Sequence, residues 1–275
     1  MPLSPYACEN CGFWQRYFAP PPDCPVCTDV RNDLPADGWS WLTATAAEDA
    51  YAGRIDRIGE DFYEAVTTPH LGLAGRGWMT VRDGVLVGFE AAPFYSPVML
   101  DEVAALAGET RLAASHVHGY GALWQLQDRL NPSVLAIHKD DLQLTKAFRV
   151  TSPFDERLTL AGGMTMIHVG GHYEGQSVLY DEEARRLFCG DMFKIDQDEE
   201  GRAVAISTHK AFHKNIPMTH EELRRYRDAI APLDFTEVCS PFERAEDVGK
   251  ALCLAVLDRA LSEPPAVTHY EVASL

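Results

Sequence analysis

The sequence predicts an α/β fold of alternating strands and helices, preceded by a small metal-binding module. Three observations lead to this prediction. From about residue 60, segments with strand-like and helix-like hydrophobic patterns follow one another along the chain. The first 35 residues carry two close cysteine pairs in place of such a pattern. The chain has 275 residues, 46% of them hydrophobic, which suffices for one large domain with an appendage.

The N-terminal module, residues 1–35, contains two C-x-x-C pairs. The four cysteines are Cys8, Cys11, Cys24 and Cys27. Four thiolates are a usual ligand set of structural, tetrahedral Zn²⁺, and a redox-active iron in the same cage is the alternative. A segment of this size cannot bury a core, so metal binding is expected to supply its folding free energy. We therefore predict a zinc-ribbon-like module with a structural zinc ion.

We place the main domain at residues 36–262. In its first half the sequence predicts a hairpin followed by helices and strands. Residues 78–81 and 85–89 form the hairpin, because Asp83-Gly84 supplies a tight turn. Residues 100–106 and 121–130 predict helices. Residues 111–115 and 134–137 predict strands, the second of them buried.

The second half predicts three strands and two helices. The strands are residues 164–169, 177–180 and 186–189. Thr219 and Glu222 have the spacing of a capping box, which predicts a helix to about residue 230. A last helix is expected over residues 244–261 and ends before Pro264-Pro265. Residues 263–275 are expected to be a loosely held tail.

Three predicted strands are each followed by side chains that bind metals. His116 and His118 follow the first, and their i, i+2 spacing would direct both rings to one side of an extended backbone. His172 lies in a Gly-Gly-His loop after the second. Asp191 follows the third in a Gly-Asp sequence. The order of these motifs indicates a metal site built from strand ends.

This order resembles the metallo-β-lactamase-fold family, whose pattern is His-x-His-x-Asp-His, then Gly-His, then strand-Gly-Asp, then a late histidine. The resemblance extends over about residues 60–260. It implies an αββα sandwich with the metal at one edge between the two sheets. Carried over to this chain, His116, His118 and His172 would be ligands of the first metal. Asp191 would be the carboxylate that bridges two metals in the family.

The sequence departs from the family at the ligands of the second metal. Tyr120 stands in place of the family's aspartate and Gly121 in place of its next histidine. No histidine occurs at residues 238–242, where the late one is expected. What remains is one mononuclear site for a divalent cation, zinc or iron. Three neutral imidazoles and one carboxylate would leave it about one net positive charge, enough to acidify a bound water.

Three further residues carry weaker indications. Tyr120 either faces the metal and donates a hydrogen bond to an oxyanion, or fills the space of the absent second metal. His209 and His213 follow Asp191 in a polar segment. Each could be a replacement ligand or a proton donor, but the sequence favours a solvated loop for both.

The leading functional hypothesis is a mononuclear metal-dependent hydrolase. A metal-bound water or hydroxide would attack a small-molecule ester, thioester, lactone or related bond, and Asp191 would accept the proton of the water. Two alternatives remain open at this point. One is an iron sulfur dioxygenase-like oxidoreductase, and the other is a non-catalytic scaffold with a degenerate site.

Composition limits the classes of partner and the cellular compartment that we expect for this protein. Forty-one acidic and 24 basic residues give a net charge of −17, so nucleic acid is not an expected partner and a small-molecule substrate is. No run of 18 apolar residues occurs, so no membrane partner is expected. The start of the sequence has no secretory pattern, and the paired cysteines suit a reducing compartment, which predicts a cytoplasmic protein. The sequence does not indicate an oligomeric state.

Overall fold

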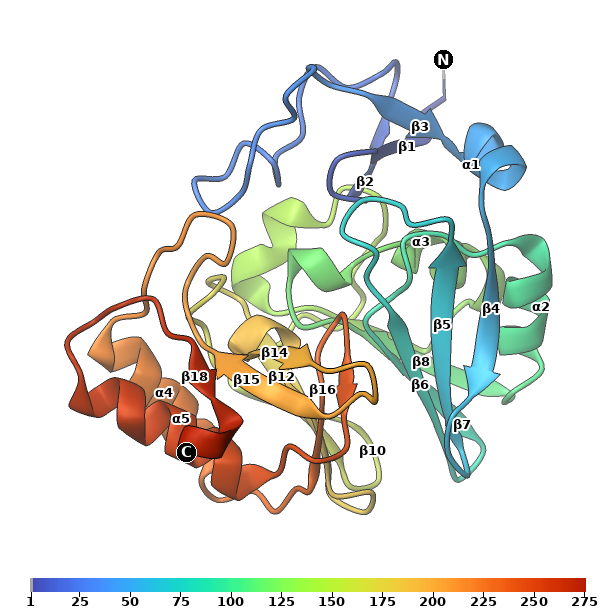
Figure 1. Ribbon diagram of the computed structural model, residues 1–275. Helices are drawn as coiled ribbons and strands as arrows, with labels where there is room; N and C mark the ends of the chain where they lie inside the picture. The colour runs from blue at the N-terminus through green and yellow to red at the C-terminus, as the bar shows by residue number, and fades with distance from the viewer. Residues whose placement is uncertain (1) are drawn as a thin grey trace. The chain divides into compact units, whose positions relative to one another are not determined.

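The computed structural model describes residues 2–275 and divides the chain into two compact units, Met1–Phe154 and Asp155–Leu275. Each unit contains a six-stranded sheet, a three-stranded sheet and its own helices (Figure 1). Each half of an αββα sandwich consists of one sheet and its helices. The six-stranded sheet and the helices of each unit correspond to one such half. Among residues 2–275, no helix is both long and apolar enough to cross a bilayer. The predicted boundaries at residues 35 and 262 stay predictions.

The six-stranded sheet of the first unit is antiparallel at one side and parallel at the other. Its strands, in sheet order, are β4 (Ala52–Arg57), β5 (Phe62–Thr68), β6 (Gly77–Arg82), β7 (Val85–Phe89), β8 (Glu109–Ala113) and β9 (Val134–Ala136). The predicted β6–β7 hairpin is confirmed. Helices α2 (Pro97–Ala104) and α3 (Leu123–Leu130) connect the parallel strands β7, β8 and β9. His116 therefore lies just beyond the carboxyl end of β8, which is Ala113.

The predicted metal-binding module is built on the other sheet of the first unit. This sheet has the order β2 (Trp14–Tyr17), β1 (Ser4–Cys8), β3 (Trp41–Thr43), and helix α1 (Ala44–Ala50) follows it. The sulfur atoms of Cys8 and Cys27 lie 3.8 Å apart, and those of Cys11 and Cys24 lie 3.6 Å apart. A tetrahedral zinc ion with bonds of about 2.3 Å requires sulfur separations of about 3.8 Å. The four cysteines thus fit a tetrahedral metal ion.

The six-stranded sheet of the second unit has the order β10 (Arg157–Ala161), β11 (Met164–His168), β12 (Ser177–Asp181), β13 (Arg186–Phe188), β16 (Glu237–Cys239), β17 (Arg244–Ala245). Helices α4 (His220–Ile230) and α5 (Lys250–Ser262) pack their apolar faces into the same core as these strands. The predicted capping box is present, because Thr219 accepts from the Glu222 N–H and Glu222 accepts from the Thr219 N–H. The second, three-stranded sheet is β14 (Lys194–Gln197), β15 (Ala203–Ser207), β18 (Tyr270–Glu271).

Two features near the C-terminus differ from the prediction. The last helix begins at Lys250 rather than at residue 244, because Arg244 and Ala245 pair with Cys239 and Val238 of β16 as strand β17. The last residues are more firmly packed than a loose tail. Tyr270 pairs with Ile206 of β15, is 6% exposed, and lies under the Arg259 guanidinium. Aromatic burial and strand pairing thus hold this end of the chain.

We predict that Cys24→Ser removes one metal ion per chain, because a hydroxyl is a poor replacement for a thiolate ligand. Hydrogen exchange of residues 2–35 should become faster, since metal binding supplies the folding free energy of the module. Elemental analysis and hydrogen-exchange mass spectrometry measure the two effects. Cys253→Ala, which changes a buried cysteine of α5, is the matched control, and this variant should keep the metal ion of the four-cysteine cluster. Unchanged metal content in Cys24→Ser would refute the four-cysteine assignment.

Candidate metal-binding site

The two histidines of the first unit meet at a turn rather than along a strand. The backbone of His116 is extended, with φ −166°, and the chain then forms a single 3₁₀ turn, η1 (Val117–Gly119). The ring centroids of His116 and His118 lie 4.9 Å apart at 71°, and one ring nitrogen of each lies within 4.8 Å of the other. The predicted proximity is therefore confirmed, whereas the predicted extended backbone is wrong. The turn brings the rings together.

The ring of His116 is oriented by its neighbour. His116 is fully buried, and a hydrogen bond of 2.8 Å joins its Nδ1 to Ser115 Oγ. Metal-binding histidines commonly use their second nitrogen in such a bond, which fixes the tautomer and the ring orientation. With Nδ1 used in this way, Nε2 is the nitrogen that would coordinate a cation.

Close packing of backbone against backbone holds the turn that carries the two histidines. The Ala91 N–H donates to Gly119 O, and the Ala122 N–H donates to Ala92 O, both at 2.9 Å. Gly121 lies between these bonds with φ +38°, and a Cβ there would stand 2.1 Å from Ala91 O. A histidine at this position would require the backbone of residues 91–92 to move. The absence of the family's next histidine is thus built into the packing.

Tyr120, the other departure from the family pattern, is buried in the first unit. It is 1% exposed, and its ring packs edge-on against Phe148 with centroids 5.4 Å apart. This burial favours the interpretation that Tyr120 fills space. Its catalytic role stays a prediction.

In the second unit, a tyrosine of α4 shapes the His172 loop. Gly171 has φ +88°, and a Cβ there would lie 2.5 Å from the hydroxyl oxygen of Tyr226. That hydroxyl accepts a hydrogen bond from the His172 N–H at 3.0 Å and one from Gln176 at 3.3 Å. Burial raises the pKa of Tyr226 well above its usual value, so the hydroxyl stays neutral. The sequence analysis missed this residue, whose spacing in α4 only indicates a core position.

Asp191 meets His172 at the spacing that a metal ion needs. Asp191 lies in the short turn η3 (Gly190–Met192), directly after β13. His172 Nε2 and Asp191 Oδ2 are 3.3 Å apart, and the two residues are 2% and 6% exposed. Two ligands at about 2.0–2.1 Å from a tetrahedral cation lie about 3.3 Å from each other. The pair therefore fits two ligands of one ion.

His209 is buried in the second unit, so the prediction of a solvated loop is wrong for it. It is 6% exposed, and its ring lies 4.2 Å from that of Phe212, which in turn lies 5.7 Å from the ring of His172. Burial, with the positive charge of Lys194, lowers the pKa of His209 to about 4. His213 of the same loop is exposed, as the sequence predicts. Apolar Ala211 and Phe212, which lie between the two histidines, are a weak sequence signal of this difference.

A second carboxyl group stands next to the expected place of the late histidine. That segment contains Cys239 and Ser240, and the Ser240 hydroxyl accepts from the N–H groups of Phe242 and Glu243. Glu243 Oε1 accepts from the Ile195 N–H at 3.0 Å. Burial, aided by the charge of Asp191, raises the pKa of Glu243 to about 6. No motif in the sequence indicates this residue.

Each unit thus brings its own share of the predicted ligands together. The first unit pairs His116 with His118 and gathers the four cysteines. The second pairs His172 with Asp191, and Phe212 contacts the rings of both His172 and the buried His209. The union of the two pairs in one site stays a prediction.

Comparisons with known proteins identify the fold. No family model matches the sequence. The uncharacterized protein YmaE of Bacillus subtilis is 23% identical over 255 residues, covering 87% of this chain and 89% of that protein. VMB-1 matches in structure with a TM-score of 0.57 and 12% identity, over 76% of this chain and 98% of that one. The matched 76% of this chain is more than the length of either unit, because the longer unit comprises 154 of the 275 residues. The match therefore includes residues of both units.

Two further solved structures agree. A metallo-β-lactamase from Hirschia baltica has a TM-score of 0.51 and 15% identity, over 78% of this chain and 99% of that one. The metallo-β-lactamase FIM-1 from Pseudomonas aeruginosa, in its mono-zinc form, has a TM-score of 0.52 and 9% identity, over 77% and 97%. The chain therefore has the metallo-β-lactamase fold, with a four-cysteine cluster near its N-terminus.

Proposed function

We propose that this chain is a mononuclear metal-dependent hydrolase acting on a small-molecule ester, thioester, lactone or related bond. The proposed ligands are His116, His118, His172 and Asp191. One observation carries the proposal. The second unit brings His172 and Asp191 to the spacing of two ligands of one ion, the first unit brings a ring nitrogen of His116 and one of His118 within 4.8 Å of each other, and the fold match extends over both units.

The chemistry divides between the cation and the protein. A divalent cation with such ligands lowers the pKa of water to about 7 and so supplies a nucleophile at neutral pH. Asp191 is suited to accept the proton that the water loses. Ser115 orients His116, and Tyr226 fixes the loop of His172. We further propose zinc for this site, because histidine and carboxylate ligands suit it.

Packing favours one cation over two. Gly121 leaves no room for a histidine, and residues 238–242 contain none. FIM-1, a protein of the same fold, has a mono-zinc form, so this fold can hold a single zinc ion.

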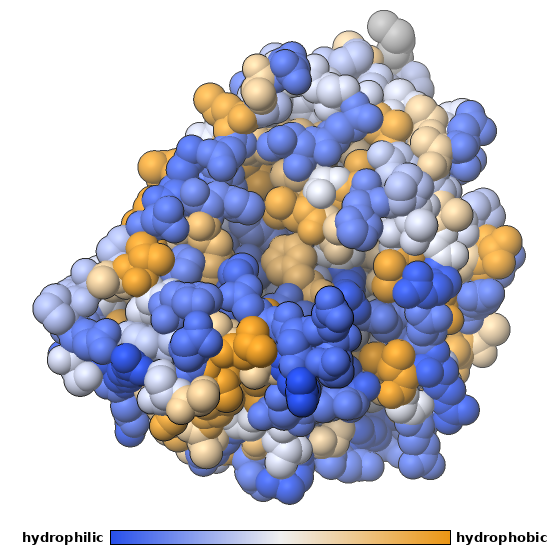
Figure 2. All heavy atoms as spheres, in the orientation of Figure 1, coloured by the Kyte–Doolittle hydropathy of each residue, from blue (hydrophilic) through white to orange (hydrophobic). Residues whose placement is uncertain are grey.

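The surface supports a small-molecule substrate. The net charge of −17 repels phosphate backbones, and hydrophilic residues predominate on the face drawn in Figure 2. Nucleic acid is therefore not a proposed partner.

We predict two metal ions per chain in the purified protein, one on the four cysteines and one at the proposed active site. His172→Ala should leave one, because an apolar methyl replaces a ligand while the cysteines are untouched. Elemental analysis of the folded protein gives the numbers. His213→Ala, an exposed histidine, is the control and should retain two. Three ions per chain would mean that a second cation site exists.

Hydrolysis should depend on the cation and on His118. We expect the rate with p-nitrophenyl acetate, a phenyl thioester or a lactone to rise towards neutral pH, because the water must first lose a proton. His118→Ala should lower kcat/KM by at least about 100-fold, and chelation should do the same. Exposed His70 in the same unit is the control position. Hydrolysis that survives both treatments would refute a metal-dependent mechanism.

The same measurements separate the alternative functions. Iron in the active site, with oxygen consumption, would indicate an oxidoreductase. Metal on the cysteines alone would indicate a scaffold.

A further inference from the structure

We propose that His209 is a catalytic residue that donates a hydrogen bond to the carbonyl oxygen of an acyl substrate. This rests on the proposed function, because it assumes that the carbonyl carbon is attacked next to His172 and Asp191. It narrows the substrate to acyl compounds whose oxygen gains negative charge during the reaction.

The first support is the position of the His209 ring within the second unit. Phe212 contacts both His209 and His172, with ring centroids 4.2 Å and 5.7 Å away. One phenyl ring thus separates His209 from a proposed metal ligand, and the 3.3 Å contact of His172 with Asp191 completes the group. Through Phe212 the His209 ring belongs to the same cluster as the ligand pair, and the proposal places the substrate carbonyl oxygen against this ring.

The second support is the way in which the backbone before His209 is fixed. The Thr208 hydroxyl donates to Met192 O at 3.0 Å. This bond joins the residue that precedes His209 to the residue that follows Asp191. The Thr208 N–H donates to the Thr268 hydroxyl at 2.8 Å, and that hydroxyl donates back to Thr208 O at 2.9 Å. These bonds set His209 relative to Asp191 before any substrate arrives.

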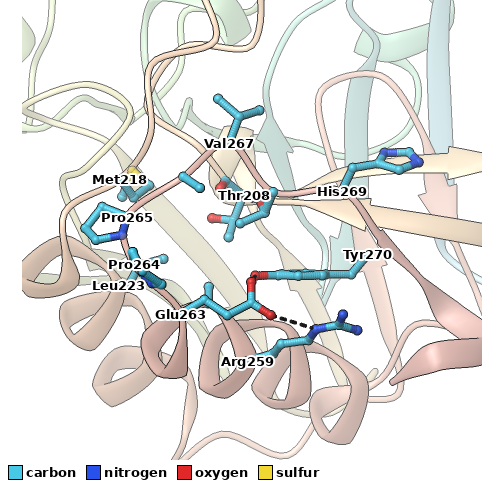
Figure 3. Close-up of a pocket in the computed structure, with 13 residues that line it drawn as sticks. Thr208, Met218, Leu223, Arg259, Glu263, Pro264, Pro265, Val267, His269 and Tyr270 are labelled. Atoms are coloured by element: carbon cyan, nitrogen blue, oxygen red, sulfur yellow. Dashed lines mark hydrogen bonds and ion pairs between the residues drawn. The ribbon is translucent and has the colours of Figure 1, made fainter.

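The C-terminal segment supports Thr208 from the outer side. Figure 3 shows Thr208 next to the segment from Glu263 to Tyr270, around a cavity of about 180 Å³. The polar groups of this cavity bind one another, because Glu263 accepts from Tyr270 at 2.9 Å and from Arg259 at 3.2 Å. The cavity walls thus form a brace for the strand end that carries His209.

The third support is the chemical state of the ring. Among residues 2–275, His209 Nδ1 has no hydrogen-bond partner although it is buried. Burial of a polar atom of this kind is unfavourable unless a hydrogen-bond partner satisfies it. Burial keeps the imidazole neutral above about pH 4, and the nearby Thr208 backbone, which acts to raise the pKa, is its competing partner for the one N–H that a neutral ring carries. A neutral donor is what a substrate oxygen requires.

The charge next to His209 favours an oxygen over a second cation. The positive charge of Lys194, from β14, is felt at the His209 ring, and Lys194 is also paired with Asp196. The part of this charge that Asp196 does not compensate would stabilise a partly negative oxygen rather than a second cation. This supports a role of His209 towards the substrate.

The reaction balances without another reagent. Water loses a proton to Asp191 and adds to the carbonyl carbon, and the C=O π electrons move to the oxygen, where the His209 N–H stabilises them. The electrons return, the bond from carbon to the leaving oxygen or sulfur breaks, and the proton passes to the leaving group. Water and an ester, thioester or lactone become an acid and an alcohol or thiol.

His209→Ala and His209→Asn test the proposal in the metal-loaded full chain. Removal of one oxyanion donor lowers kcat by about 100-fold or more, so we expect this loss for His209→Ala with p-nitrophenyl acetate, with KM little changed. His209→Asn keeps an N–H near the Nδ1 position and should recover most of kcat. His213→Ala in the same loop is the matched control and should behave as the wild type.

A binding measurement provides a readout besides turnover. Methylphosphonate is a stable tetrahedral anion, and its calorimetric Kd should rise by about 10-fold in His209→Ala, the value of one hydrogen bond to a charged group. Metal content should be unchanged. If the wild type binds metal and hydrolyses the ester but His209→Ala keeps kcat and the methylphosphonate Kd, the role of His209 is wrong. Loss of metal in His209→Ala would make it a ligand and would equally overturn the proposal. A wild type with no metal outside the cysteines would instead refute the proposed function.

Discussion

The close approach of two backbone segments in the first unit is the constraint on which the candidate site depends. Residues 91–92 after β7 and residues 119–122 after β8 bind each other through backbone hydrogen bonds, with Gly121 at the contact. This contact fixes the turn that brings His116 and His118 together. It also removes the side chain with which the family binds a second metal. The same packing therefore creates the histidine pair and leaves no room for a side chain at position 121.

The second unit reaches a comparable result by polar anchoring. The Tyr226 hydroxyl holds the backbone of His172, and the Thr208 hydroxyl holds the backbone next to Asp191. Both anchors are buried hydroxyls from elements distant in sequence, α4 and the end of β15. Buried hydrogen bonds of this kind rigidify a site because breaking one leaves an unsatisfied polar group. Each proposed ligand pair is thus positioned within its own unit, by a different physical means.

Much of this arrangement could be predicted from local sequence. The β6–β7 hairpin and the capping box of α4 depend on turn and cap residues a few positions apart, and both are confirmed. The cysteine spacing likewise anticipated a cluster that fits one ion. The order of histidines and aspartate anticipated the fold, because strand ends carry the ligands in this architecture.

Features that depend on distant segments were beyond the reach of the sequence. The start of α5 was misplaced because Arg244 and Ala245 pair with β16, a contact that local pattern does not reveal. The backbone before His209 is held by the hydrogen bond of Thr208 to Thr268, sixty residues away, and the C-terminal residues are held by β15. Helix and turn signals act over a few residues, whereas these outcomes follow from the three-dimensional packing of each unit.

The central claim is one metal ion held jointly by His116, His118, His172 and Asp191. Anomalous diffraction from crystals of the metal-loaded protein, collected on both sides of the zinc absorption edge, tests it most directly. The account predicts two peaks per chain, one among the four cysteines and one in contact with all four of these residues. A peak that contacts only one of the two ligand pairs, or a third peak beside Tyr120, would contradict it.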